Sequence, residues 1–231
     1  MSSPGGGAAL RARDLGRDYG ELVALEELDL EVNQGERVAL VGHNGAGKST
    51  LLSLAAGLLE PSHGWIRIGE APAGSIEARA ATSYVPDSPV LYDDLSLNEH
   101  MEYIARLHGV GDWAARSRSI LERLSLAEWG ENLPTQFSRG MRQKASIALG
   151  LIRPFAVLLA DEPFDGLDPA SREQLDALLD EARGEGAAIL VSTHRAEGVE
   201  SASRCIGLHD GRLVYNGPPE VGKIPDFLAP G

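Results

Sequence analysis

Three short apolar runs constrain the fold of this 231-residue chain more than any other feature. They are RVALVG (Arg37–Gly42), AVLLADEP (Ala156–Pro163) and AAILVSTH (Ala187–His194). Each begins as a nearly continuous stretch of small and branched apolar residues, which is typical of parallel strands buried on both faces. Each then leads into a polar loop and a helical pattern. The alternation predicts an α/β fold whose ligands bind at the carboxyl ends of the strands.

The rest of the chain is predicted to add two subdomains to this core. Residues 88–155 are mostly helical, because SLNEHMEYIARLHG and DWAARSRSILERLSL space their apolar residues with a 3.6-residue period. Shorter alternating stretches, LVALEELDLEV and GWIRIGE, together with an Asp210-Gly211 hairpin signal, predict antiparallel β-structure. We expect a flexible tail over residues 1–8, one domain over 9–217 and a C-terminal extension over 218–231.

Composition and charge restrict the classes of partner. The net charge is −13, whereas a protein that binds nucleic acid without sequence preference normally presents a basic face. No apolar run approaches the roughly 18 residues that a membrane-spanning helix needs. The single cysteine, Cys205, fits a reducing compartment. We therefore expect no nucleic-acid partner and no direct membrane insertion, so that another protein must hold this chain at any membrane where it works.

The stretch GHNGAGKST follows the first apolar run and opens a helical run, KSTLLSLAAGLL. It fits the pattern G-x-x-x-x-G-K-S/T in the strand–loop–helix context that a phosphate-binding loop requires. Glycines allow backbone N–H groups to surround phosphate oxygens, and the helix N-terminus adds its positive end. We expect Lys48 to reach the β- and γ-phosphates and the Ser49 hydroxyl to bind Mg²⁺. The predicted nucleotide-binding residues here are Gly42, His43, Asn44, Gly45, Ala46, Gly47, Lys48, Ser49 and Thr50.

The other two apolar runs end in residues suited to catalysis. Asp161, at the end of its strand, can hold Mg²⁺, and Glu162 can deprotonate an attacking water. Without a phosphate loop, this acidic pair would simply cap the following turn. His194 ends the third run; a lone histidine there is more often structural, but the shared sheet places it where it can face the same phosphate.

The stretch FSRGMRQK has two interpretations. Ser138 can cap the helix that follows by accepting a backbone N–H of its first turn. The same helix N-terminus can also bind an anion.

The order and spacing of these motifs resemble the nucleotide-binding subunit of ATP-binding cassette (ABC) transporters, from about Leu10 to Gly217. GHNGAGKST resembles the Walker A loop of that family, LLADEP its Walker B, FDGLD (Phe164–Asp168) its D-loop and STH its switch histidine. FSRGMRQK lies where the family carries its LSGGQ signature: Ser138 and Gly140 match, whereas Phe137, Arg139 and Met141 depart. Tyr19 lies where the family places a ring that stacks on adenine.

The resemblance implies a fold, a reaction and partners. The fold would be a P-loop NTPase core with a mixed, largely parallel sheet, an antiparallel β subdomain and an inserted α-helical subdomain. Two subunits, identical or different, would enclose two ATP-Mg²⁺, with Ser138 and Gly140 of one facing the γ-phosphate held by the other. Glu162, His194 and Lys48 would hydrolyse ATP to drive transmembrane permease subunits. The chain would then be cytoplasmic, peripheral on the inner face of the cell membrane through its permease.

One position departs from the family pattern. The Q-loop glutamine of the family should fall within YVPDSPVLY, but no glutamine occurs between Ser83 and Tyr92, and Asp87 occupies the aligned position. Asp87 either binds Mg²⁺ through a water or caps the next turn, since Asp before Ser-Pro is an ordinary turn former. This departure and SRGMRQ in place of SGGQ resemble the exporter-type branch that handles drugs, ions or lipids. The rival interpretations are a non-transport ABC ATPase, acting in DNA repair or at chromosomes or ribosomes, and an inactive regulatory module.

Overall fold

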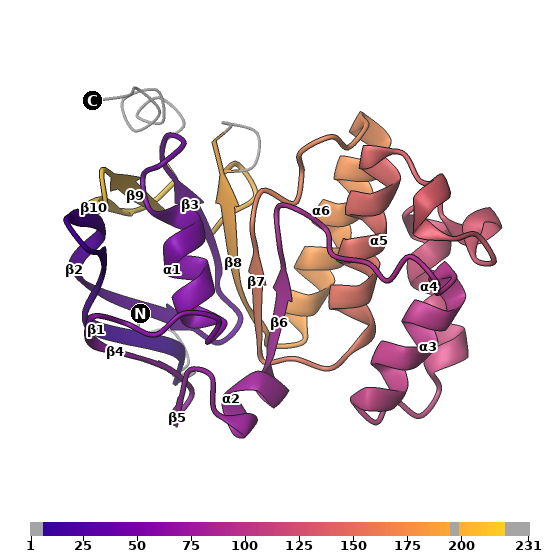
Figure 1. Ribbon diagram of the computed structural model, residues 1–231, viewed down its shortest axis with the longest axis horizontal. Coiled ribbons are helices and arrows are strands. Elements are labelled where there is room, and N and C mark those ends of the chain that lie inside the picture. The colour runs from indigo at the N-terminus through magenta and orange to yellow at the C-terminus, as the bar shows by residue number, and fades with distance from the viewer. Residues whose placement is uncertain (1–6, 195–198, 220–231) are drawn as a thin grey trace.

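The computed structural model describes residues 7–194 and 199–219, and its core is a six-stranded sheet in the order β10-β9-β3-β8-β7-β6 (Figure 1). Five strands run parallel: β3 (Arg37–Val41), β6 (Thr82–Val85), β7 (Val157–Ala160), β8 (Ala188–Thr193) and β9 (Arg204–His209). β10 (Arg212–Gly217) pairs antiparallel with β9 at one edge. The three apolar runs are therefore confirmed as adjacent parallel strands β3, β8 and β7.

A second sheet is antiparallel and has the order β2-β1-β4-β5. Its strands are β1 (Ala8–Tyr19), β2 (Leu22–Asn33), β4 (His63–Ile68) and β5 (Ala71–Pro72). Two of them contain the alternating stretches LVALEELDLEV and GWIRIGE, so the expected antiparallel β-structure is confirmed. Together with α1 (Lys48–Ala55), this sheet covers one face of the six-stranded sheet (Figure 1).

Helices cover the opposite face of the six-stranded sheet. α5 (Arg139–Ile152) and α6 (Pro169–Gly184) pack against the strands, and α3 (Leu97–Leu107) and α4 (Trp113–Arg123) pack on α5 at the far side (Figure 1). The short helix α2 (Ile76–Ala81) precedes β6, and single 3₁₀ turns span Ala127–Trp129 and Pro134–Gln136. The predicted helices of the middle segment are thus present, and the mixed α/β fold class is confirmed.

The strands are apolar throughout because the core lies on both of their faces. Along β7, Val157 and Leu159 join the cluster under the antiparallel sheet, whereas Leu158 and Ala160 join the cluster under the helices. Successive side chains of a strand point to opposite faces, so a strand covered on both sides carries no polar alternation. This double burial explains why the runs were recognisable in the sequence.

The predicted division into a tail, a domain and an extension falls partly outside the described residues. Residues 1–6 of the predicted tail and 220–231 of the predicted extension lie outside them, and β1 begins at Ala8. The boundaries of the helical subdomain, 88–155, stay a prediction. Among residues 7–194 and 199–219, no helix is both long enough and apolar enough to cross a membrane.

Candidate functional site

The phosphate loop joins the carboxyl end of β3 to the N-terminus of α1. Gly47, the residue before the helix, has a φ of 101°, in the left-handed region that favours glycine. A Cβ built there would lie 2.7 Å from the carbonyl oxygen of Ala24, and one on Gly42 would lie 2.4 Å from that of Leu208. The loop therefore passes so close to neighbouring backbone that only glycine fits at these two positions.

The side chain of Lys48 folds back over this loop. Its ammonium Nζ donates to the backbone oxygen of Gly42 at 2.7 Å and to that of His43 at 3.2 Å. It also lies 3.6 Å from a carboxylate oxygen of Glu162, and the side chain is only 6% exposed. A buried cation at a helix N-terminus forms a strongly anion-attracting site.

Two acidic residues follow β7 and are held by a serine of β8. The Ser192 hydroxyl donates to Asp161 Oδ1 at 2.5 Å and accepts the backbone N–H of Glu162 at 2.8 Å. Asp161 is 3% exposed and Glu162 has a φ of 46°, which turns the chain sharply at the strand end. Ser192 was not among the predicted site residues; its place two residues before His194, on the same strand end, was the available signal.

Glu162 and His194 contact each other across the ends of β7 and β8. His194 Nδ1 lies 3.0 Å from Glu162 Oε2, and the backbone N–H of His194 donates to the same oxygen at 3.3 Å. Burial raises the pKa of the Glu162 carboxyl, and the charges of Lys48 and His194 offset part of this rise. A carboxylate with a raised pKa is a stronger base, which suits proton abstraction from water.

These groups line one hollow with a cavity volume of about 470 Å³. Residues that follow three strands line this hollow, because β3, β8 and β7 are neighbours and their carboxyl ends meet at one edge of the sheet. The phosphate loop and the start of α1 contribute Asn44, Gly45, Gly47, Lys48, Ser49 and Thr50. Other segments of the chain contribute Asp87, Arg139, Asp161, Glu162, Asp165 and His194. The structure thus brings together most of the predicted nucleotide-binding and catalytic residues.

The donor set of the hollow fits Mg²⁺. The Ser49 hydroxyl and the Asp161 carboxylate line the same space, and Ser192 occupies only one of the two carboxylate oxygens of Asp161. Mg²⁺ prefers such hard oxygen ligands and usually binds through one or two protein groups plus phosphates and waters. Asp87 is exposed at the rim, two residues after β6, and its predicted metal role stays a prediction.

Ser138 caps helix α5 as one of its two interpretations requires. Its hydroxyl oxygen accepts the backbone N–H of Met141 at 3.3 Å, and the side chain is exposed. Neither Ser138 nor Gly140 is among the described residues that line the hollow, although Arg139 is. A Cβ on Gly140 would lie 2.9 Å from the Gly166 carbonyl oxygen, so this helix start packs on the segment after Walker B. Binding of an anion from a second subunit stays a prediction.

Tyr19 ends β1 and is 45% exposed. The guanidinium of Arg17 lies 4.6 Å from the centre of its ring. Tyr19 is not among the described residues that line the hollow, so adenine stacking stays a prediction.

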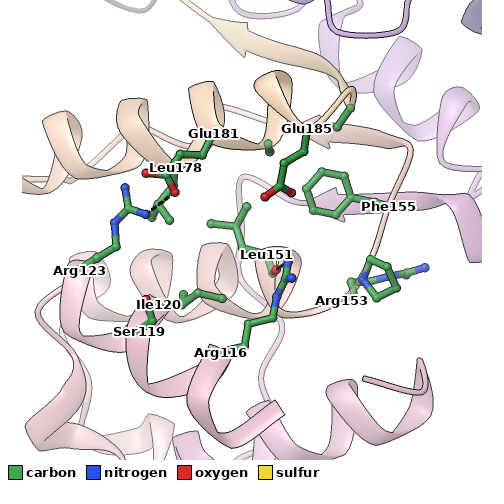
Figure 2. A pocket seen from close by; sticks show the side chains of 13 residues that line it. Arg116, Ser119, Ile120, Arg123, Leu151, Arg153, Phe155, Leu178, Glu181 and Glu185 are labelled. Carbon is green, nitrogen blue, oxygen red and sulfur yellow. Dashed lines mark hydrogen bonds and ion pairs between the residues drawn. The ribbon is translucent and has the colours of Figure 1, made fainter. Parts of the chain in front are cut away.

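A separate cavity of about 360 Å³ lies between α4, α6 and the end of α5 (Figure 2). Three arginines line it, but each donates within the chain: Arg116 to the Leu151 carbonyl at 2.8 Å, Arg153 to the Arg79 carbonyl at 2.8 Å, and Arg123 to Glu181 at 2.6 Å. Figure 2 shows the Arg123–Glu181 ion pair joining α4 to α6. These contacts tie the helical segment to the core, and none of the predicted site residues lies there.

Comparisons with known proteins agree with this geometry. The model of the family described as "ABC transporter" matches residues 25–165. The SkfA peptide export ATP-binding protein SkfE of Bacillus subtilis is 34% identical over 210 residues, covering 90% of this chain and 88% of the relative. The phosphonates import ATP-binding protein PhnC 2 of Haloarcula marismortui is 35% identical over 215 residues, covering 85% and 79%. The dimeric structure of MJ0796, a bacterial ABC transporter cassette, matches with a TM-score of 0.83 and 25% identity, covering 91% of this chain and 99% of that one.

Proposed function

The chain belongs to the ABC transporter family, and we propose that it powers substrate translocation by separate transmembrane subunits. It is an ATPase that binds ATP and dimerises, as the family implies. The observation that carries the proposal is the convergence of Lys48 and the adjacent pair Asp161 and Glu162 on one hollow from two segments that lie far apart in the sequence. A regulatory module without activity would not need a base, a cation and a metal ligand in one place.

Each residue has a distinct task in ATP hydrolysis. The backbone N–H groups of the phosphate loop and the Lys48 ammonium bind the β- and γ-phosphates. Glu162 accepts the proton of the attacking water, and its raised pKa makes it a better base than an exposed glutamate. His194 orients the Glu162 carboxylate, with Nδ1 3.0 Å from Oε2, and would face the same phosphate. Ser49 and Asp161 would hold Mg²⁺, which would neutralise part of the phosphate charge.

The dimer completes the site in this proposal. Ser138 and Gly140 lie at the exposed N-terminus of α5 and do not line the hollow of their own chain, so they are available to a nucleotide held by a second subunit. Closure with ATP and opening after hydrolysis would move permease subunits that are separate chains. The chain would then lie on the cytoplasmic face of the cell membrane, bound to its permease.

We propose export as the direction of transport. Of the two relatives described above, one is named for export and the other for import, so these relatives do not decide the direction of transport. The support is Asp87 in place of the Q-loop glutamine and SRGMRQ in place of SGGQ, which resemble the exporter-type branch.

ATP turnover by the purified chain tests the catalytic assignment. Glu162→Gln should lower turnover by about 10²- to 10⁴-fold, the usual contribution of a general base, while ATP binding is retained. Lys48→Ala should weaken ATP binding itself, measured by direct titration. Glu173→Gln, which changes an exposed glutamate of α6, is the matched control and should behave like the parent. Full turnover in Glu162→Gln contradicts the assignment.

Transport requires the native membrane. The tagged chain should co-purify from detergent-solubilised membranes with a multi-spanning protein, and the ATPase activity of that complex should respond to its substrate. Inside-out vesicles containing the complex should accumulate substrate when ATP is added if the direction is export, and release preloaded substrate if it is import. Isolation with a DNA or ribosome complex, and with no membrane protein, would favour the non-transport rival.

A further inference from the structure

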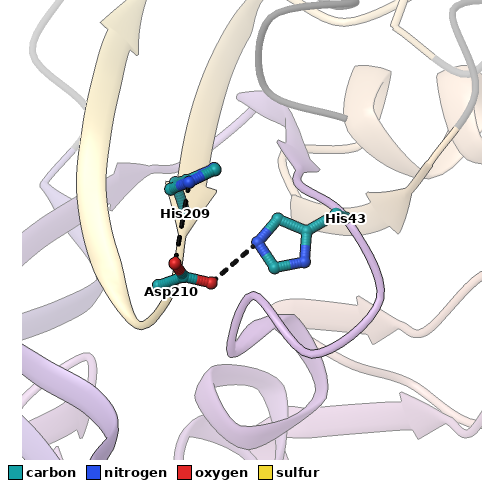
Figure 3. Close-up of side chains that lie close together, drawn as sticks. All are labelled: His43, His209 and Asp210. Atoms are coloured by element: carbon teal, nitrogen blue, oxygen red, sulfur yellow. Dashed lines mark ion pairs between the residues drawn. The ribbon is translucent and has the colours of Figure 1, made fainter. Parts of the chain in front are cut away.

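A second group of polar side chains lies on the other side of the phosphate loop. His43 follows Gly42 in the loop, His209 is the last residue of β9, and Asp210 begins the turn to β10. Figure 3 shows Asp210 next to both imidazole rings, with one carboxylate oxygen directed at each. ATP hydrolysis as proposed above uses none of these side chains.

The three side chains are close enough to share one ion. His43 Nε2 lies 3.0 Å from Asp210 Oδ1, and His209 Nε2 lies 3.7 Å from Asp210 Oδ2. One ligand atom from each residue can be chosen so that all three lie within 4.8 Å of one another. Ligands of a tetrahedral Zn²⁺, bound at about 2.0–2.2 Å, lie about 3.3 Å apart, so small side-chain rotations suffice.

The hydrogen bond of His43 determines which of its nitrogens faces the group. His43 Nδ1 lies 2.9 Å from the Asn44 carbonyl oxygen, which can only accept, so Nδ1 carries the proton. In a neutral ring, Nε2 then carries a lone pair, and it lies 3.0 Å from Oδ1 of the Asp210 carboxylate. Nε2 is buried and accepts no hydrogen bond from the described residues. Two acceptors that face each other at this distance are stabilised only by a metal ion or a proton between them.

We propose that His43, His209 and Asp210 form a binding site for a divalent transition metal, with Zn²⁺ as the best fit. Two imidazole nitrogens and one carboxylate suit Zn²⁺ and its neighbours, whereas Mg²⁺ prefers oxygen ligands. The Asn44 carbonyl acts as the outer partner that orients a metal-binding histidine. Asp210 is 62% exposed, which leaves the fourth position open to water.

The surrounding backbone holds the site ready for an ion. Asp210 and Gly211 both have positive φ, 47° and 80°, so the turn is tight and places Asp210 beside the loop. The Gly211 N–H donates to the Ala46 carbonyl of the phosphate loop at 3.1 Å, and the Gly211 carbonyl accepts the Glu26 N–H at 2.9 Å. The hairpin and the phosphate loop are therefore already joined. A bound ion would add a second link between them, next to the nucleotide site.

A proton on His43 Nε2 would also satisfy the contact with Asp210. If a proton and not a metal ion occupies this contact, the proposal is wrong. Metal titration distinguishes the two. The untagged full chain, free of nucleotide and in millimolar Mg²⁺, is titrated with Zn²⁺ by calorimetry and with Co²⁺ by visible absorption. One site per chain should bind Zn²⁺ in the presence of Mg²⁺, and Co²⁺ should give the absorption of a nitrogen- and oxygen-bound ion.

Variants assign the ligands. His209→Ala and Asp210→Asn should each weaken Zn²⁺ binding by at least about 100-fold, the upper end of what loss of an outer-shell partner alone costs. Asn also tolerates positive φ, so Asp210→Asn keeps the turn. His63→Ala, which changes an exposed histidine that pairs with Asp18 at 3.1 Å, is the matched control and should leave binding unchanged. Melting curves check that each variant is folded.

Three results would overturn the assignment: no Zn²⁺ binding by the parent, undiminished binding in His209→Ala, or loss of binding only in His194→Ala. The last result would place the ion at Glu162, Asp165 and His194, a second group among the described residues whose ligand atoms could hold a metal.

Discussion

Ser138→Asp separates the two interpretations of the start of α5, where Ser138 does not line the nucleotide hollow of its own chain. Aspartate caps a helix about as well as serine and favours the positive end of the dipole, so α5 should keep its stability. Ser138→Ala instead removes the acceptor of the 3.3 Å bond from Met141 N–H. That loss should cost about 1 kcal/mol and lower the melting temperature by about 2–4 °C for a chain of this size.

For ATP-dependent dimerisation the order of the two variants should be reversed: Ser138→Asp should weaken the dimer more than Ser138→Ala does. If Ser138 faces the γ-phosphate of a nucleotide on a second subunit, the new carboxylate meets like charge. At about 4 Å and an effective dielectric constant of about 20, that repulsion is about 4 kcal/mol per site. Such a cost weakens association by about 10³-fold for each site. Ser138→Ala should weaken the dimer far less, because it adds no charge.

Light scattering after size-exclusion chromatography measures this directly. Both variants are made together with Glu162→Gln, so that ATP is bound without being consumed, and each is examined with and without ATP-Mg²⁺. The reasoning is refuted if Ser138→Asp dimerises with ATP as fully as the Ser138 parent does. Ser138 would then be only a helix cap, and the proposed completion of the site by a second subunit would fail. Ser138 is a better position than Gly140 for this substitution. A Cβ on Gly140 would lie 2.9 Å from the Gly166 carbonyl oxygen, so a change there would also disturb packing within the chain.

Three further predictions concern the nucleotide hollow. Tyr19→Ala should weaken ATP and GTP equally, by about 1–3 kcal/mol, if the half-exposed ring stacks on the base; unchanged titration curves for both would show a structural ring. Asp87→Ala should lower turnover at limiting Mg²⁺ and recover with excess Mg²⁺, and an unaltered Mg²⁺ dependence would leave Asp87 as a turn former. Glu162→Gln should raise the melting temperature at neutral pH, because burial raises the carboxyl pKa. With a raised pKa the folded chain binds more protons than the unfolded chain, so the carboxyl costs stability as the pH rises through that pKa. The advantage of Gln should disappear as the pH falls below the ordinary glutamate value of 4.5, and a gain that does not change with pH would contradict the assigned cause.

The sequence alone determined the parts of this protein that depend on local pattern. The strands β3, β7 and β8 were predictable because a strand buried on both faces must be apolar at every position. Ser138 was predictable as a cap because capping involves atoms only three residues apart. The Asp210-Gly211 turn was predictable because few residue pairs adopt two positive φ angles in succession.

Tertiary structure decided which of these local features meet. β6 was not predicted: its four residues, TSYV, are too short for a period to stand out, and its place beside β7 depends on pairing across the sheet. Ser192 looked like an ordinary strand residue until the adjacency of β8 and β7 placed its hydroxyl between Asp161 and Glu162. Arg139 was predicted to depart from the signature and to add a positive charge near it, but its partner could not be predicted; the packing of α5 makes Arg139 line the nucleotide hollow of its own chain.

The group formed by His43, His209 and Asp210 shows the same limit most clearly. His43 was assigned to nucleotide binding because of its position in the loop motif, whereas its ring is directed at Asp210. The pairing of β3 with β9 is what brings the loop and the hairpin together. A sequence pattern records the backbone that a segment prefers, but a contact between distant segments depends on strand order. Strand order is set by burial of the whole sheet, and no single segment encodes it.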